Sequence, residues 1–126
     1  MERILVDTCI LISAYRGNKD ISNVLKKFHH KLVISPITIM ELYRGLKTRE
    51  KKRELEKQLK SYSIIHINKD VTEKAIGILK KYQSNKRNIF IPDCLIAATC
   101  ILYDYQLFTE NKSDFEFIEN IRFFKL

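Results

Sequence analysis

The chain has 126 residues, 45% of them hydrophobic and 30% charged, and its formal net charge at pH 7 is +8. This length and apolar content predict one domain over residues 1–126, with a substantial core. No apolar run approaches the ~20 residues of a membrane span, and the N-terminus lacks the small-residue cleavage site of a signal peptide. We therefore expect a cytoplasmic protein, and the positive charge favours a polyanionic partner, most commonly nucleic acid.

The cysteines and histidines do not form a zinc motif. Cys9, Cys94 and Cys100 are an odd number and include no C-x-x-C pair. They lie in apolar stretches that we predict to be helical, where a buried free thiol is the usual state. None of the three histidines supplies the ligand spacing that a structural zinc site needs.

The chain opens on a predicted strand, residues 4–6, whose apolar side chains suit burial on both faces. Thr8 is predicted to cap a helix over residues 9–15, which Gly17 should end. Asp7 lies where the strand should end, and two interpretations of it stay open. Ligands of open α/β sheets bind beyond the carboxyl ends of the strands, which places Asp7 at the expected site. A carboxylate at this position can also simply help to cap the helix.

Strands and helices are predicted to alternate along the rest of the chain. The predicted elements are a helix capped by Asp20, a strand at 31–35, a helix from Pro36, a strand at 63–67, a helix from Asn68 or Asp70 to Tyr82, a loop at 83–88, a buried helix over 94–102, and strands at 106–108 and 122–125. The helix from Pro36 either runs on into the charged segment around Leu55 and Leu59 or breaks before it, since no clear stop follows Gly45. This alternation predicts an α/β fold in which helices cover both sides of a mostly parallel sheet.

Two features of the middle of the chain bear on function. In the helix from Pro36 the apolar face carries Ile39 and Leu42, and helical rotation puts Glu41 roughly opposite, as a surface glutamate beside Arg44. The stretch over residues 44–60 then contains eight basic residues and three glutamates. It suits contact with a polyanion, and part of it suits an ordinary solvated helix face with ion pairs between neighbouring turns.

Acidic and polar side chains gather at the predicted carboxyl edge of the sheet. Asp7 follows the first strand, Asn111 and Asp114 follow the strand at 106–108, and Asp93 lies in the first turn of the buried helix. Converging carboxylates repel one another unless a cation lies between them. Oxygen ligands without Cys or His favour Mg²⁺ or Mn²⁺, and such an ion in a basic protein suits phosphodiester hydrolysis. Spacing alone does not establish that these side chains converge.

Three segments resemble, in order and spacing, the motifs of PIN-domain ribonucleases and of the VapC-type toxins of toxin–antitoxin pairs. They are VDTCILISAYRG at 6–17, SPITIMELYRGLK at 35–47 and PDCLIAATCILYDYQLFTENKSDF at 92–115. The resemblance implies a three-layer α/β/α fold with a mostly parallel sheet of about five strands. It also implies that Asp7, Glu41 and Asp93 bind Mg²⁺ or Mn²⁺, which overrides the reading of Glu41 as a surface residue.

The same resemblance assigns supporting positions. Asn111 stands where family members often have a fourth acidic residue, and Asp114 is a nearby alternative for that ligand. Thr8 and Thr109 would form hydrogen bonds beside the metal. Five cations are our candidates for RNA contact: Lys47, Arg49, Lys51, Lys52 and Arg53. An equally open interpretation is that part of this stretch meets an antitoxin or a second toxin chain.

The resemblance implies an Mg²⁺- or Mn²⁺-dependent endoribonuclease in which metal-activated water attacks RNA. It further implies a VapB-like antitoxin partner and a homodimer. Two alternatives share the fold: an RNA-binding module without activity, and a PIN-type RNA-processing nuclease outside a toxin–antitoxin pair. A metal-dependent phosphatase with an Asp-x-Asp motif is disfavoured, because Cys9 stands where the second aspartate is needed.

Overall fold

The computed structural model describes residues 2–83 and 88–126, and within them the fold is a five-stranded, all-parallel sheet in the order β3-β2-β1-β4-β5. The strands are β1 (Ile4–Val6), β2 (Leu32–Ile34), β3 (Ser63–Ile64), β4 (Gln106–Phe108) and β5 (Arg122–Phe123). Each lies where a strand was predicted. The two edge strands are shorter than predicted, because their inner neighbours β2 and β4 are themselves three residues long and offer few pairing positions.

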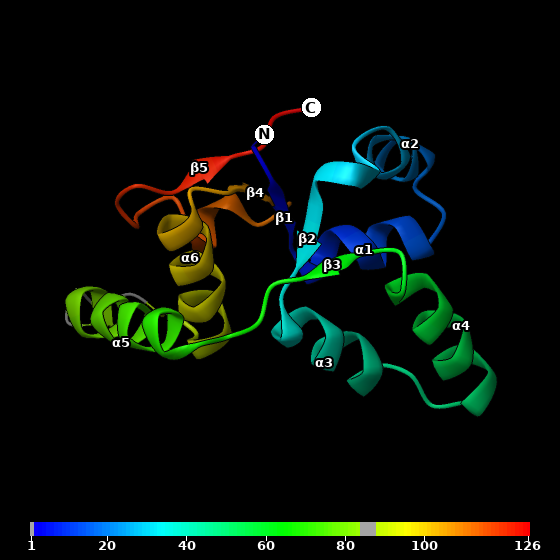
Figure 1. Ribbon diagram of the computed structural model, residues 1–126, viewed down its shortest axis with the longest axis horizontal. Coiled ribbons are helices and arrows are strands. Elements are labelled where there is room, and N and C mark those ends of the chain that lie inside the picture. The colour runs from blue at the N-terminus through cyan, green and yellow to red at the C-terminus, as the bar shows by residue number, and fades with distance from the viewer. Residues whose placement is uncertain (1, 84–87) are drawn as a thin grey trace.

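The helices of the described chain connect these strands (Figure 1). They are α1 (Thr8–Tyr15), α2 (Lys19–Lys27), α3 (Pro36–Arg44), α4 (Arg49–Leu59), α5 (Lys69–Tyr82) and α6 (Ile91–Tyr103), with short 3₁₀ turns η1 (His29–Lys31) and η3 (Lys112–Asp114). Residues 84–87 of the loop predicted at 83–88 lie outside the described residues.

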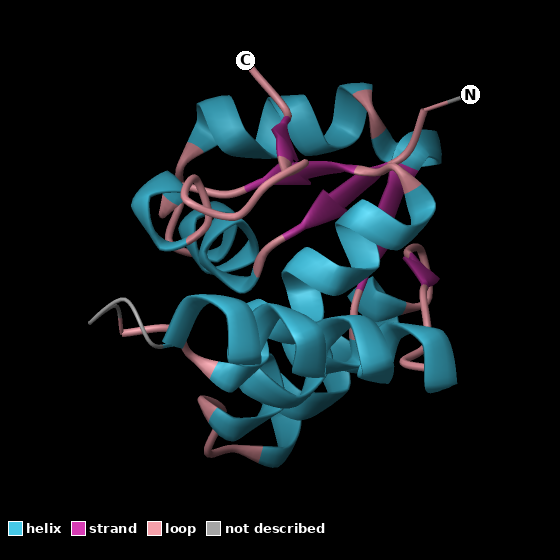
Figure 2. Cartoon of the chain, turned by 90° about the vertical axis from the view of Figure 1, so that its left-hand side faces the viewer, coloured by secondary structure: helices cyan, strands magenta, loops and turns pink. Residues whose placement is uncertain are grey.

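The sheet is buried on both faces, so the fold has three layers. Along β1, Leu5 points into a core shared with α5 and α6, whereas Ile4 and Val6 point into a second core shared with α1, α2, α3 and α4. Figure 1 shows these two groups of helices on opposite sides of the strands, and the two ends of the chain lie at the same end of the molecule in Figures 1 and 2. The predicted three-layer α/β/α architecture is confirmed.

The strand order creates one switch point. From β1 the chain adds β2 and β3 on one side, and it then returns to add β4 and β5 on the other side of β1. The connections after β1 and β4 therefore leave neighbouring strands in opposite directions, and ligands of open α/β sheets bind beyond the carboxyl ends of the strands at such a point. Asp7 follows β1 and Thr109 follows β4 at this position.

Local capping differs from the prediction at several helices. Thr8 is the first residue of α1 rather than its cap; Asp7 has extended backbone angles and its carboxylate accepts a hydrogen bond from the backbone N–H of Thr8. Asn18, not Asp20, caps α2, because the Asn18 side chain is in reach of the Ile21 N–H. The charged stretch 44–60 forms a separate helix, α4, which Thr48 caps after α3 ends at Arg44.

The cysteines follow the prediction in two cases out of three. Cys94 and Cys100 are buried free thiols on α6. Cys9 is only partly buried, because the first turn of α1 lies at the edge of the sheet rather than under it. No helix in the described residues is long and apolar enough to cross a membrane.

Candidate active site

Asp7 joins the two central strands at their carboxyl ends. Its backbone N–H donates to the carbonyl of Phe108 at 3.0 Å, which extends the pairing of β1 with β4 by one residue. One carboxylate oxygen, Oδ1, accepts from the Thr8 N–H at 2.9 Å, and the other, Oδ2, accepts from the Thr109 hydroxyl at 2.8 Å. Asp7 is therefore both the cap of α1 and a carboxylate at the switch point, so the two interpretations of this residue are compatible.

Glu41 reaches the same edge from α3 through Thr8. The Thr8 hydroxyl donates to Glu41 Oε1 at 2.7 Å and lies 3.2 Å from the buried hydroxyl of Thr38. The buried residues of α3 are Thr38 and Leu42, and Glu41 is one turn after Thr38, on the edge of the buried face. Glu41 is exposed, as the periodicity of the apolar residues predicted, and its carboxylate nevertheless reaches Thr8 at this edge of the sheet.

Asp93 lies partly buried in the first turn of α6, as predicted. Burial, and after it the negative charges of Asp7, Asp114 and Glu41, together raise the pKa of its carboxyl group to about 7. Carboxylates from four separate parts of the chain therefore act on one another at this edge of the sheet. In the described residues none of the four is in an ion pair.

The loop after β4 brings Asn111 to this edge. The backbone N–H of Asn111 donates to the Thr109 hydroxyl at 3.0 Å, and the Asn111 carbonyl accepts from the Asp114 N–H at 3.0 Å. Both side chains are exposed. Thr109 itself is buried and links this loop to Asp7, in the supporting position expected from the sequence.

The chemistry of these side chains fits a hard divalent cation, since the donors are carboxylate and amide oxygens with an excess of negative charge. The arrangement of these side chains in space does not by itself form a full set of metal ligands. Within the described residues no group of three or more Asp, Glu, His or Cys side chains is arranged so that it could hold a metal ion. The carboxylates are close enough to raise the pKa of Asp93 but are not drawn together as one ligand set.

The five predicted basic residues lie on α4 or just before it, and only some of the cations near the acidic side chains were predicted. Lys47 precedes α4, and Arg49, Lys51, Lys52 and Arg53 are exposed in its first two turns. Of these five, Lys51 lines a hollow of about 530 Å³ that also contains Glu41. Arg16, at the C-cap of α1, lines the same hollow and was missed by the sequence analysis. The sequence could have indicated Arg16, because it lies at the end of the helix that begins after Asp7.

The five-stranded parallel sheet covered by helices on both sides is the fold of a PIN domain, and the comparisons with known proteins agree. The chain belongs to the PIN-domain family, whose family model matches residues 4–119.

Known relatives refine this assignment to the VapC type, as the sequence motifs predicted. The chain is 31% identical over 121 residues to ribonuclease VapC10 of Mycobacterium tuberculosis, covering 94% of this chain and 90% of that protein. Among solved structures it is 30% identical to a toxin–antitoxin complex from Klebsiella pneumoniae, with a TM-score of 0.79 and 94% of each chain covered. VapBC2 from Rickettsia felis, bound to a promoter DNA fragment, shares the fold with a TM-score of 0.86, 23% identity and 98% of each chain covered.

Proposed function

We propose that this protein is an Mg²⁺- or Mn²⁺-dependent endoribonuclease and the toxin of a VapBC-type toxin–antitoxin pair, acting in the cytoplasm. The observation that carries the proposal is the gathering of Asp7, Glu41, Asp93 and Asp114 at the switch point of a protein of net charge +8, where burial and then the three neighbouring carboxylates raise the pKa of Asp93 to about 7. A bound cation would neutralise this negative charge, and the relatives are ribonucleases of the same family.

The roles of the residues follow from their positions. Asp7 and Asp93 would hold the ion, and Glu41 would bind it or orient the attacking water, with Asn111 or Asp114 as the weaker fourth ligand. A bound divalent ion supplies a Lewis acid that activates water and stabilises charge on the phosphate. Thr109 and Thr8 would keep the carboxylates of Asp7 and Glu41 in fixed orientations through their hydrogen bonds of 2.8 and 2.7 Å.

RNA would enter past Arg16 and Lys51. These two cations line the hollow that contains Glu41, so they can contact phosphates next to the one being hydrolysed. The exposed cations Lys47, Arg49, Lys52 and Arg53 would extend this basic surface away from the acidic residues. Their role would be to attract the backbone over a longer range, with little effect on its placement.

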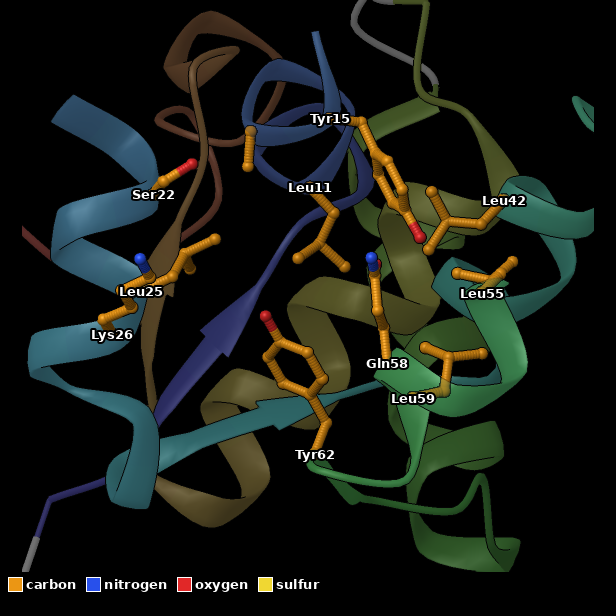
Figure 3. A pocket seen from close by; sticks show the side chains of 11 residues that line it. Leu11, Tyr15, Ser22, Leu25, Lys26, Leu42, Leu55, Gln58, Leu59 and Tyr62 are labelled. Atoms are coloured by element: carbon orange, nitrogen blue, oxygen red, sulfur yellow. The ribbon is translucent and has the colours of Figure 1, made fainter. Parts of the chain in front are cut away.

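A VapB-like antitoxin would occupy the groove between α2 and α4, which Figure 3 shows. The groove measures about 390 Å³ and has apolar walls that include Leu11, Leu25 and Leu59, with Tyr15 at the end shared with the hollow of Glu41. An amphipathic segment fits such a groove. A partner in this position would extend toward the carboxylates and would cover the site.

A second copy of the chain would bind where apolar side chains remain exposed on α3 and at the start of α6. Met40 is 58%, Phe90 58% and Ile91 64% exposed. The two helices contact each other. Exposed apolar groups of this size are typical of protein interfaces, and a homodimer would bury them.

The experiment that tests the function measures cleavage of RNA by the purified protein with Mg²⁺, with Mn²⁺ and with EDTA, together with the Asp7→Asn variant. We expect cleavage that needs the metal and that Asp7→Asn abolishes. The control is Asp20→Asn, which changes an exposed carboxylate in the first turn of α2 and should leave cleavage unchanged. RNA that is bound but not cleaved would indicate an RNA-binding module without activity. Full cleavage by Asp7→Asn would remove the assignment of the site.

A further inference from the structure

Two consecutive backbone N–H groups after β4 reach the same oxygen of Asp7, each through one side chain. The N–H of Asn111 donates to the Thr109 hydroxyl, which donates to Asp7 Oδ2 at 2.8 Å. The N–H of Glu110 donates to the sulfur of Cys9 at 3.4 Å, and the thiol of Cys9 donates to the same Oδ2 at 3.6 Å. The two links also touch each other, with the Cys9 sulfur 3.5 Å from the Thr109 hydroxyl oxygen.

The family resemblance led us to expect Thr109 to form hydrogen bonds in this position, whereas Cys9 was expected to be a buried free thiol. Its position is different from that of an ordinary core cysteine. Cys9 is partly buried and lines an open hollow of about 620 Å³ together with Ser13, Arg16 and Glu110. Loss of its sulfur would therefore enlarge a hollow that is already open, and would cost little of the cavity energy that a buried cysteine contributes.

We propose that Cys9 is a positioning residue, whose thiol ties the loop of Asn111 to Asp7 and fixes the orientation in which Asp7 binds the divalent ion. This inference rests on the proposed function. Hydrogen bonds of sulfur are weak and long, so the contribution is to geometry rather than to folding. Residues that orient a metal ligand typically change metal affinity by about 10- to 100-fold when they are removed.

The variants are Cys9→Ala, which removes both hydrogen bonds, and Cys9→Ser, which keeps a donor and an acceptor at a shorter reach. The matched control is Ser13→Ala, which removes one polar atom from the same helix and the same hollow without touching Asp7. Mn²⁺ binding to the metal-free protein is measured by electron paramagnetic resonance without RNA. Cleavage is measured over a range of Mn²⁺ concentrations, and unfolding is followed in EDTA.

We expect Cys9→Ala to weaken Mn²⁺ binding about 10-fold, with Cys9→Ser within about 3-fold of the unmodified chain and Ser13→Ala unchanged. High Mn²⁺ should restore the cleavage rate of Cys9→Ala, since the defect lies in binding the ion. Unfolding in EDTA should be the same in all four proteins. A second readout needs no metal: amide hydrogen exchange at Glu110 should be faster in Cys9→Ala, because that N–H loses its acceptor.

Three results would overturn the inference: Mn²⁺ affinity of Cys9→Ala within 2-fold of the unmodified chain, Cys9→Ser as weak as Cys9→Ala, or an unchanged exchange rate at Glu110. If the unmodified chain binds no Mn²⁺ and cleaves no RNA, the proposed function fails as well, whereas normal metal binding by Cys9→Ala removes only the role of Cys9.

Discussion

The unpaired charge at Asp93 should cost folding stability, and removing it should stabilise the metal-free protein. The native carboxyl has a pKa of about 7 against the ordinary 3.8. Between these two values the folded chain binds a proton that the unfolded chain has lost, so stability falls as the pH rises through this window. Above a pH of about 7 the charged Asp93 lowers the folding stability by its full amount. Asp93→Asn keeps the shape of the side chain and removes the charge.

The size of the effect follows from the pKa change. Each pKa unit corresponds to about 1.4 kcal/mol, so a carboxyl fully shielded from solvent would lose about 4 kcal/mol of folding free energy at pH 8. Asp93 is only partly buried, and solvent screening reduces the figure to about 1–2 kcal/mol. For a domain of this length that gain corresponds to a rise in Tm of about 5 °C.

The assay is urea unfolding in EDTA at pH 8 and at pH 4.5. We expect Asp93→Asn to be more stable than the unmodified chain at pH 8 and close to it at pH 4.5, while losing RNA cleavage. Asp20→Asn is the control, because it removes a carboxylate from the first turn of an exposed helix and so matches the loss of charge at the helix N-terminus. Equal or lower stability of Asp93→Asn at pH 8 would refute the reasoning, since burial and the neighbouring carboxylates would then not destabilise the charged form of Asp93.

Four further substitutions test other parts of the structure. Thr8→Val removes the hydroxyl that holds the glutamate of α3 at 2.7 Å, and we expect about 10-fold slower cleavage with unchanged RNA affinity, measured by kinetics and by binding. Arg16→Gln should weaken RNA binding and lower the slope of log affinity against log salt by about 0.7, whereas Lys74→Gln on the exposed face of α5 should do neither. Gly77→Ala should raise the free energy of unfolding by about 0.5–1 kcal/mol, because the helix has open space there; Gly17→Ala should lower it by about 1 kcal/mol, because Gly17 has φ +95°. Urea unfolding at pH 7 distinguishes these two outcomes.

Local pattern was sufficient for most of the fold. Apolar runs and capping residues predicted the five strands and five of the six α-helices in the described residues, because burial of a strand on both faces and of one stripe of a helix leaves a direct trace in the order of residues. They left open whether α4 is a separate helix or a continuation of α3. The misplaced boundaries, such as Asn18 in place of Asp20, differ by one to three residues. They reflect which of two suitable side chains reaches the first free N–H, which depends on backbone angles.

The residues of the candidate site also fall into two groups, those that local sequence features identify and those that only tertiary contacts identify. Asp7 and Asp93 were found from their positions at a strand end and in a helix first turn, which are local features. Glu41 and Cys9 were not, because their roles depend on hydrogen bonds to residues 33 and 101 positions away in the chain. The sequence by itself determined the elements and the acidic residue types. Only the tertiary structure decided which of these residues meet, because strand order brings β1 beside β4 and the packing of Thr38 turns Glu41 toward Thr8.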